Sequence, residues 1–195
     1  MDIDTRLVRA IQAGDMTAFD ALVHRHKDKL FNLVYRFLGD YQEADECSQE
    51  IFIKVYKSID TFKFESTFST WLFRIAVNTC KNRLKSSGYR WKKKTIPLEN
   101  PGSSKDGNPA FEIANGSPSP TAALEKKERW ARVQKAINSL PEEQNRVVVL
   151  RDIQGLSYQE ISDITGLNPG TVKSKLSRAR LALKNKLNPL LIKHL

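Results

Sequence analysis

The polar side chains between Thr171 and Arg178 are the residues of this chain best suited to contact DNA bases. Hydroxyl groups and long or forked cationic donors can reach base edges in the major groove and the phosphates beside it. The residues of this kind are Thr171, Lys173, Ser174, Ser177 and Arg178. After Asp163 the chain has no acidic residue, so the segment lies in a positive field. The pattern is typical of a DNA-recognition helix, although a solvated basic helix would share its composition.

Two short helices must position this segment. Ser157, with Glu160 three residues later, predicts a capped helix start, and Gly166 predicts its end. Asn168 is a good N-cap for a second helix, with Pro169 at its first position, where no backbone donor is lost. The apolar residues of the second helix recur at helical spacing: Val172, Leu176, Ala179 and Leu183. Two helices joined by a short turn containing Gly predict a helix-turn-helix.

Charge is distributed unevenly along the 195 residues, whose formal net charge is +10. Residues 1–84 hold 12 Lys and Arg against 12 Asp and Glu, whereas residues 85–195 hold 20 against 10. The positive excess belongs to the second half alone, which favours a polyanionic partner there and a different electrostatic task for the first half.

The first 85 residues follow helical periodicity. Apolar residues recur at spacings of three and four from Phe19 to Leu38, and Gly39 ends that pattern. Further helices are expected from about Gln42 to Ile59 and from about Ser69 to Lys85. Their expected core residues are Ala44, Cys47, Ile51, Val55, Ile59, Leu72, Ile75, Ala76 and Thr79. No long stretch alternates with a period of two, so we predict an all-α fold.

Residues 86–123 separate two small helical domains. This stretch is rich in Gly, Pro, Ser and Asn and has almost no apolar periodicity, so we expect a flexible linker. The expected architecture is an N-terminal helical bundle, residues 1–85, and a C-terminal helix-turn-helix bundle, residues 124–195. The sequence leaves open how the two domains lie relative to one another when the protein is free.

The second helix of the N-terminal domain opens with a dense group of acids. These are Asp40, Glu43, Asp45, Glu46 and Glu50, and no Lys or Arg lies between Leu38 and Ile53. The helix dipole explains some acids near a helix N-terminus. It does not explain five of them beside Gln49, Phe52 and Ile53, which favours contact with a basic protein surface.

The third helix has a polar and basic stripe. Its members are Arg74, Asn78, Lys81 and Lys85, with Asn82 beside them. Phe62 and Phe64 lie in the loop before the helix and are the aromatic residues least easily assigned to a helix face. Aromatic rings beside cations can stack unpaired bases, although most of the aromatic residues nearby are expected to be core.

The remaining reactive residues indicate no catalytic or metal site. Cys47 and Cys80 belong to no CxxC motif and are expected to be reduced thiols in helices. His24 and His26, two residues apart on a helix, do not share a face. No phosphate-binding GxxxxGK loop or HExxH motif is present. No apolar run reaches the roughly 20 residues that span a membrane, so we expect a soluble, cytoplasmic protein that is not inserted in a membrane. Since the motifs of catalytic and cofactor sites are missing, we also expect that the protein is not an enzyme and needs no cofactor.

Two parts of the chain resemble conserved regions of bacterial extracytoplasmic-function (ECF) sigma factors. The second region is matched by QEIFIKVYKSIDTF (Gln49–Phe62) and FSTWLFRIAVNTCKNRL (Phe68–Leu84), and the fourth by Ser139–Arg180. The order of the regions, the length of the chain and the linker match as well. The resemblance implies a sigma factor that binds core RNA polymerase and directs promoter-specific transcription initiation, without catalysis of its own.

The resemblance also implies roles for individual residues. The β′ clamp helices of polymerase would be bound by Asp45, Glu46, Gln49, Glu50, Phe52 and Ile53. The melted −10 element would be held by Phe62, Phe64, Arg74, Asn78, Lys81 and Asn82. The −35 element would be read by Thr171, Lys173, Ser174, Ser177 and Arg178. The family usually has Asp at position 46, so whether Asp45 or Glu46 makes the main polymerase contact stays open.

Further partners implied are the β subunit of polymerase, through the C-terminal domain, and an anti-sigma factor. Two other classes of protein remain as alternatives: a stand-alone helix-turn-helix regulator, and an enzyme such as a DNA recombinase. The first leaves the acidic helix and the aromatic, basic third helix without a shared purpose. The second would need a nucleophile with clustered Arg, or a carboxylate metal site, which the N-terminal half lacks. The promoter sequence, the inducing signal and the identity of any anti-sigma factor are open.

Overall fold

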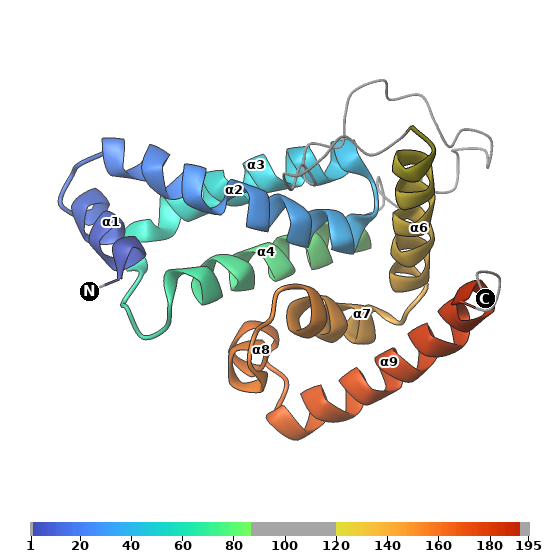
Figure 1. The fold of residues 1–195 in the computed structure, drawn as a ribbon. Coiled ribbons are helices and arrows are strands. Elements are labelled where there is room, and N and C mark those ends of the chain that lie inside the picture. The colour runs from blue at the N-terminus through green and yellow to red at the C-terminus, as the bar shows by residue number, and fades with distance from the viewer. Residues whose placement is uncertain (1, 87–119, 192–195) are drawn as a thin grey trace.

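The computed structural model describes residues 2–86 and 120–191 (Figure 1). Within these ranges every regular element is a helix, which confirms the predicted all-α fold. The N-terminal elements are α1 (Ile3–Gln12), α2 (Thr17–Leu38), α3 (Tyr41–Ser58), the 3₁₀ turn η1 (Ile59–Thr61) and α4 (Phe68–Lys85). The C-terminal elements are α6 (Pro120–Asn138), α7 (Glu142–Val148), the π-helical turn η3 (Val149–Ile153), α8 (Tyr158–Thr165) and α9 (Pro169–Leu191).

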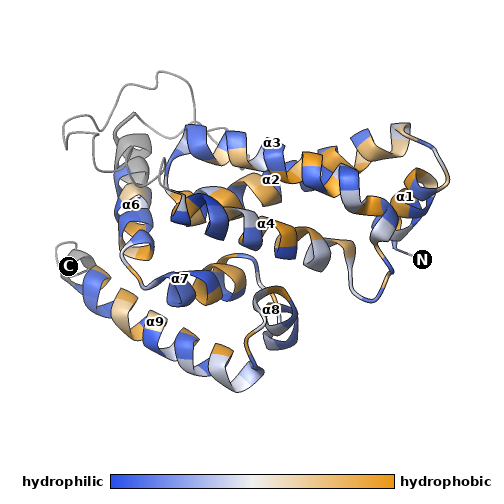
Figure 2. Cartoon of the chain, turned by 180° about the vertical axis from the view of Figure 1, so that it is seen from behind, coloured by the Kyte–Doolittle hydropathy of each residue, from blue (hydrophilic) through white to orange (hydrophobic). Residues whose placement is uncertain are grey.

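α2 is the central helix of the N-terminal domain, with α1, α3 and α4 packed against it. Figure 2 shows hydrophobic residues alternating with hydrophilic ones along these helices. Leu22, Leu30 and Leu33 are buried as the periodicity predicts, and Phe19 and Val23 are half-buried at its margin. The expected core positions of α3 and α4 are also buried, except the half-buried Ile75. The amphipathic pattern therefore predicted the core residues of these helices correctly.

The C-terminal domain surrounds a short segment that is apolar on all sides. Residues 147–150 (three valines and a leucine) are all buried, where α7 passes into η3. α9 contacts α7, while α8 and α2 contact η3, so this segment is covered from both domains. A helix covered on every side requires a continuous apolar run rather than a stripe.

The predicted caps of the helix-turn-helix are present. The backbone N–H of Glu160 donates to Ser157 Oγ at 3.2 Å, and the Glu160 carboxylate accepts from the backbone N–H of Ser157 at 2.7 Å. Gly166 ends α8 in the left-handed conformation, with φ of 74°. Asn168 Oδ1 then accepts from the backbone N–H of Thr171 at 2.8 Å and begins α9. Both ends of the turn are thus fixed by local hydrogen bonds.

The two domains pack against each other. α8 lies against α4, and α6 lies against α2 (Figure 1). A single cluster of buried apolar side chains runs from Val8 in α1 to Ala179 in α9. The sequence did not predict how the domains lie relative to one another. In the structure they are in contact, which we call the closed arrangement.

Arg36 and Gln134 form the buried polar contact between the domains. Arg36 Nη1 donates to Gln134 Oε1 at 2.8 Å, and Gln134 Nε2 donates to the carbonyl oxygen of Arg36 at 3.1 Å. The Arg36 guanidinium also lies 4.7 Å from the ring centroid of Trp130. Burial lowers the pKa of Arg36. These contacts replace the water that the buried guanidinium has lost.

The predicted domain boundaries lie close to the end of α4 and the start of α6. Ser86 follows α4 as expected, but α6 begins at Pro120, ahead of the predicted domain start at residue 124. The rest of the predicted linker, residues 87–119, lies outside the described residues. In the part of the chain that is described, no helix is both long and apolar enough to span a membrane.

Gln134→Ala should open the closed arrangement. It leaves the buried Arg36 guanidinium without its side-chain acceptor, which costs about 1–3 kcal/mol. We expect a larger radius of gyration in small-angle X-ray scattering, with the helical circular dichroism of both domains retained.

Arg132→Ala on the same helix is the matched control. Arg132 is exposed, and within the described residues its ion pair is a long one of 3.5 Å with Glu128, which is worth at most about 0.5 kcal/mol. An unchanged radius for Gln134→Ala would show that the domains are held by other contacts.

Candidate functional site

The outer face of α3 carries a group of residues that we call the acidic surface. Its members are Asp45, Glu46, Gln49, Glu50, Phe52 and Ile53. Four of them are exposed, Ile53 to 54%, whereas Glu50 and Phe52 are half-buried. Asp40 caps α3 by accepting from the backbone N–H of Glu43 at 2.8 Å. The cap places these residues within the first turns of the helix, with one apolar side chain exposed among the charges.

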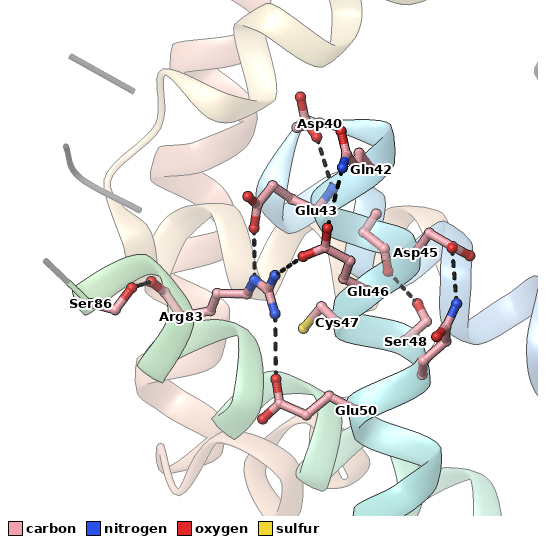
Figure 3. Close-up of polar contacts among 12 residues, drawn as sticks. Asp40, Gln42, Glu43, Asp45, Glu46, Cys47, Ser48, Glu50, Arg83 and Ser86 are labelled. Atoms are coloured by element: carbon pink, nitrogen blue, oxygen red, sulfur yellow. Dashed lines mark hydrogen bonds and ion pairs between the residues drawn. The ribbon is translucent and has the colours of Figure 1, made fainter. Parts of the chain in front are cut away.

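Arg83 of α4 lies among the acids of α3 (Figure 3). Its Nε is 2.8 Å from Glu43 Oε2, its Nη2 is 2.6 Å from Glu46 Oε2, and its Nη1 is 3.4 Å from Glu50 Oε2. Partial burial opposes the charge of Arg83, but the carboxylates of Glu43 and Glu46 outweigh it and raise the pKa of Arg83. Arg83 was not among the residues predicted from the sequence. The one feature that could have indicated it is that Arg83 is a cation of α4 that does not belong to the polar stripe.

Asp45 differs from its neighbours on the acidic surface. Gln49 Nε2 donates to Asp45 Oδ2 at 3.0 Å, and Asp45 forms no ion pair within the described residues. Glu50 pairs with Lys54 at 2.6 Å in addition to Arg83. A basic partner would therefore meet uncompensated charge at Asp45, but would have to share Glu46 and Glu50 with Arg83.

The loop before α4 places Phe62 and Phe64 in different environments. Phe62 is 6% exposed. Its ring centroid lies 4.9 Å from that of Phe64, 6.2 Å from that of Phe68 and 5.1 Å from that of Trp71. Phe64 is half-buried and has a positive φ of 60°, which is rare for a bulky residue. Both rings lie in the loop as expected, but the aromatic residues of α4 enclose Phe62 and leave Phe64 nearer the surface.

α1 holds this loop in place. Gln12 Nε2 donates to the carbonyl oxygens of Ile59 at 2.9 Å and Phe62 at 3.1 Å. The Arg9 guanidinium lies 5.4 Å from the ring centroid of Phe64. No sequence signal pointed to Gln12 or Arg9, because their partners are far away in the chain and no local pattern links them.

The polar stripe of α4 is divided by the contact with the C-terminal domain. The predicted DNA-contacting residues that are exposed are Arg74, Asn78 and Asn82. Lys81 is half-buried and lines a pocket between the domains, together with Arg146 of α7. The stripe therefore presents its first part to solvent in the closed arrangement, while Lys81 lies at the domain boundary.

α9 presents its polar residues on one side. Val172, Leu176 and Ala179 are buried to at least 99% and fix the rotation of the helix. The predicted reading residues on the outward face are Lys173, Ser174, Ser177 and Arg178, all exposed, with Thr171 half-buried beside them. The structure thus brings the five residues of this prediction together.

Two other cations of α9 are paired within the domain. Lys175 Nζ lies 2.5 Å from Glu143 Oε2, and this contact lowers the pKa of Glu143. Arg180 binds both carboxylate oxygens of Asp152, at 2.6 and 3.0 Å, and its pKa is raised. Lys173 and Arg178 form no ion pair within the described part of the chain. Uncompensated charge on this stretch of α9 therefore belongs to the outward face.

The candidate surfaces lie on two sides of α8. α8 contacts both α4 and α9 and lies between them (Figure 1). The acidic surface and the polar stripe are closer together, on the packed pair α3 and α4.

Comparison with known proteins gives the same division into two regions. The family model for Sigma-70 region 2 matches residues 22–89, and that for Sigma-70, region 4 matches residues 130–183. The RNA polymerase sigma-H factor of Pseudomonas aeruginosa is 39% identical over 188 residues, which cover 96% of this chain and 95% of that protein. The ECF RNA polymerase sigma-E factor of Escherichia coli K12 is 38% identical over 188 residues and 96% of each chain.

Solved structures share the fold. CnrH, solved in complex with the cytosolic domain of CnrY, has a TM-score of 0.68 and 25% identity over 96% of this chain and 99% of its own. The sigma factor RpoE of Bartonella quintana, solved with the anti-sigma factor NepR, has a TM-score of 0.65 and 22% identity over 87% and 96%. The sequence comparisons therefore show one family, as the two motifs predicted, and these solved structures share the fold of the chain. This chain belongs to the ECF sigma factors of the sigma-70 family, which are promoter-recognising, non-enzymatic subunits for transcription initiation.

Proposed function

We propose that α9 reads the −35 element, that α4 and the loop before it hold the −10 element, and that the acidic surface binds the β′ clamp helices of core RNA polymerase. The main support for the proposal is the arrangement of α9. One row of its residues is buried, the flanking cations Lys175 and Arg180 are paired within the domain, and the remaining polar residues form one outward face. Lys173 and Arg178 are donors for phosphates and for guanine, and Ser174 and Ser177 are short enough to let the helix approach base edges.

The polymerase contact is proposed to centre on Asp45 and Ile53. Both are exposed, and among the described residues no cation is paired with Asp45. Glu46 and Glu50 would join by sharing or exchanging Arg83. An apolar side chain surrounded by charge suits an interface with a basic helical partner.

The −10 contact is proposed to use Phe64 and Asn78, supported by Arg74 and Asn82. Phe64 is the ring of the loop that reaches the surface, and Phe62 lies beneath it. An unpaired base could stack on Phe64 and receive hydrogen bonds from Asn78 at its edge. Phe62 would then act mainly by supporting the loop, and Lys81 would become accessible once the domains separate.

The closed arrangement must open on a promoter. The −35 and −10 elements are about 25 base pairs apart, or roughly 85 Å at 3.4 Å per base pair. α4 and α9 are separated only by α8, and a helix is about 10–12 Å wide. The 33 residues 87–119 can reach at most about 110 Å when fully extended. The sequence between the domains is therefore long enough to bridge the elements, whereas the closed arrangement is too short.

Further partners follow the family. We propose that the C-terminal domain contacts the β subunit of polymerase, and that the free chain is held by an anti-sigma factor, as CnrH and RpoE are bound by partners in their structures. The proposed place of action is the cytoplasm, where RNA polymerase acts.

Reconstitution with core RNA polymerase tests the proposed function. We expect specific initiation from a promoter with both elements only when polymerase and this chain are present together. Tight binding of the isolated chain to a palindromic duplex, without polymerase, would support a stand-alone regulator instead.

Arg178→Ala should reduce discrimination at the −35 element. Loss of a bidentate contact to a guanine costs about 1–3 kcal/mol, measured as the ratio of binding to matched and mismatched −35 duplexes by the holoenzyme. Arg180→Ala is the control, because Arg180 is paired with Asp152. An equal loss of discrimination in both variants would contradict the assignment of the outward face.

Asp45→Asn should weaken binding to core polymerase and leave the fold intact. The substitution removes one exposed charge and keeps an acceptor for Gln49. We expect an about tenfold loss of affinity in a titration of labelled polymerase, with greater sensitivity to salt in the wild type.

Asp20→Asn, an exposed acid on α2, should leave the affinity unchanged. If Asp45→Asn bound as the wild type does while Glu46→Gln did not, the main contact would belong to Glu46.

Phe64→Ala should weaken the grip on single-stranded −10 DNA. Loss of one stacking platform costs about 1–3 kcal/mol, measured by holoenzyme binding to a forked template with an unpaired −10 strand. Phe62→Leu should instead lower the thermal unfolding midpoint, because Phe62 is enclosed by aromatic rings. A Phe64→Ala variant with unchanged −10 binding would rule out the proposed stacking.

A further inference from the structure

The thiols of Cys47 and Cys80 face each other across the contact between α3 and α4. Their Sγ atoms are 3.9 Å apart, and the residues are 33 positions apart in sequence. Cys47 is fully buried and Cys80 is 2% exposed. Two widely spaced cysteines gave no motif in the sequence, so only the packing of the helices brings them together.

The position of the pair on the two helices matters. In sequence, Cys47 lies between Glu46 and Gln49 of the acidic surface, and Cys80 lies between Asn78 and Lys81 of the polar stripe, but both thiols are on the buried sides of their helices. A bond between the two sulfur atoms would connect the candidate polymerase-binding helix to the candidate −10 helix.

A path from solvent reaches the pair on the Cys80 side. Cys80 lines the pocket between the two domains, together with Val77 and Leu84 of α4, Phe37 of α2 and Leu140 before α7. A small neutral oxidant such as hydrogen peroxide can approach Cys80 through this pocket.

The surroundings make the two thiols unequal. The contact with Cys80 and the nearby Arg83 guanidinium lower the pKa of Cys47, although burial opposes them. The contact with Cys47 and deep burial raise the pKa of Cys80. Cys47 therefore has more thiolate character, which is the reactive form of a cysteine.

We propose that Cys47 and Cys80 form a reversible intramolecular disulfide when the chain meets hydrogen peroxide. The Cys47 thiol first loses its proton; the thiolate then attacks one peroxide oxygen, the O–O bond breaks, and the hydroxide released takes up that proton and leaves as water. Cys80 sulfur then attacks the Cys47 sulfenic acid; the S–S bond forms, the S–O bond breaks, and a second water leaves with the Cys80 proton. Each thiol loses one electron and the peroxide is reduced to two water molecules.

The bond requires a modest adjustment of the helices. Sulfur atoms 3.9 Å apart must approach to about 2.05 Å, which side-chain rotation and a small shift of α4 can supply. Disulfides of this kind in reducing compartments are typically transient and redox-sensing. The disulfide would crosslink α3 to α4 and should stabilise the packing of these two helices.

Intact-mass spectrometry of the full-length chain treated with hydrogen peroxide tests the proposal. We expect a monomer that has lost two hydrogens, a peptide linking Cys47 to Cys80, and full reversal by dithiothreitol. The oxidised wild type should unfold at a higher temperature than the reduced protein. Cys47→Ala and Cys80→Ala should each abolish the mass loss, and Cys80→Ala should leave a Cys47 sulfenic acid that dimedone labels.

Three outcomes would overturn the proposal: only added oxygen atoms, only disulfide-linked dimers, or a lower unfolding temperature in the oxidised monomer. None of these measurements uses polymerase or DNA, so the proposal fails or stands independently of the proposed function. The wild-type mass alone decides the main point, even if a Cys variant folds poorly.

Discussion

The contact between α4 and α8 is the constraint on which the other features of this structure depend. It joins the cores of the two domains into one cluster of buried side chains. It also holds α8 between α4 and α9, while Lys81 of α4 lines the neighbouring pocket against α7 at the domain boundary. The same contact that stabilises the free chain therefore keeps the two proposed DNA surfaces too close together for a promoter. Its replacement by contacts with polymerase and DNA would be the main conformational event in the work of this sigma factor.

Within the N-terminal domain, Arg83 links α4 to α3 by ion pairs. A single guanidinium is bound by three glutamates of α3, so the acidic surface is partly neutralised from within. The exposed charge is left mainly at Asp45, and the interface that polymerase would meet is narrower than the acidic sequence indicates. Since the pair Cys47 and Cys80 lies beside Arg83, changes in the packing of α3 and α4 would also reach this surface.

Local patterns in the sequence predicted the helices, their caps and the outward face of α9, because each depends on residues three or four positions apart. Ser157 with Glu160 and Asn168 before α9 are examples. Contacts between distant segments were not predictable in this way. Gln12 reaching the loop at Phe62, Arg83 among the glutamates, and Cys47 opposite Cys80 arise only from tertiary packing. The burial of Phe62 was not predictable for the same reason: this loop residue is enclosed by the helix that follows it.

The most direct test is a distance between the two domains, measured by pulsed electron resonance with spin labels at Lys57 of α3 and Lys186 of α9. Both residues are exposed and lie outside the proposed contacts. The free chain should give one narrow distribution, and the chain bound to polymerase on a promoter should give one longer by several tens of ångströms. A distribution that is the same in both states would contradict the account, because the closed arrangement cannot reach both promoter elements.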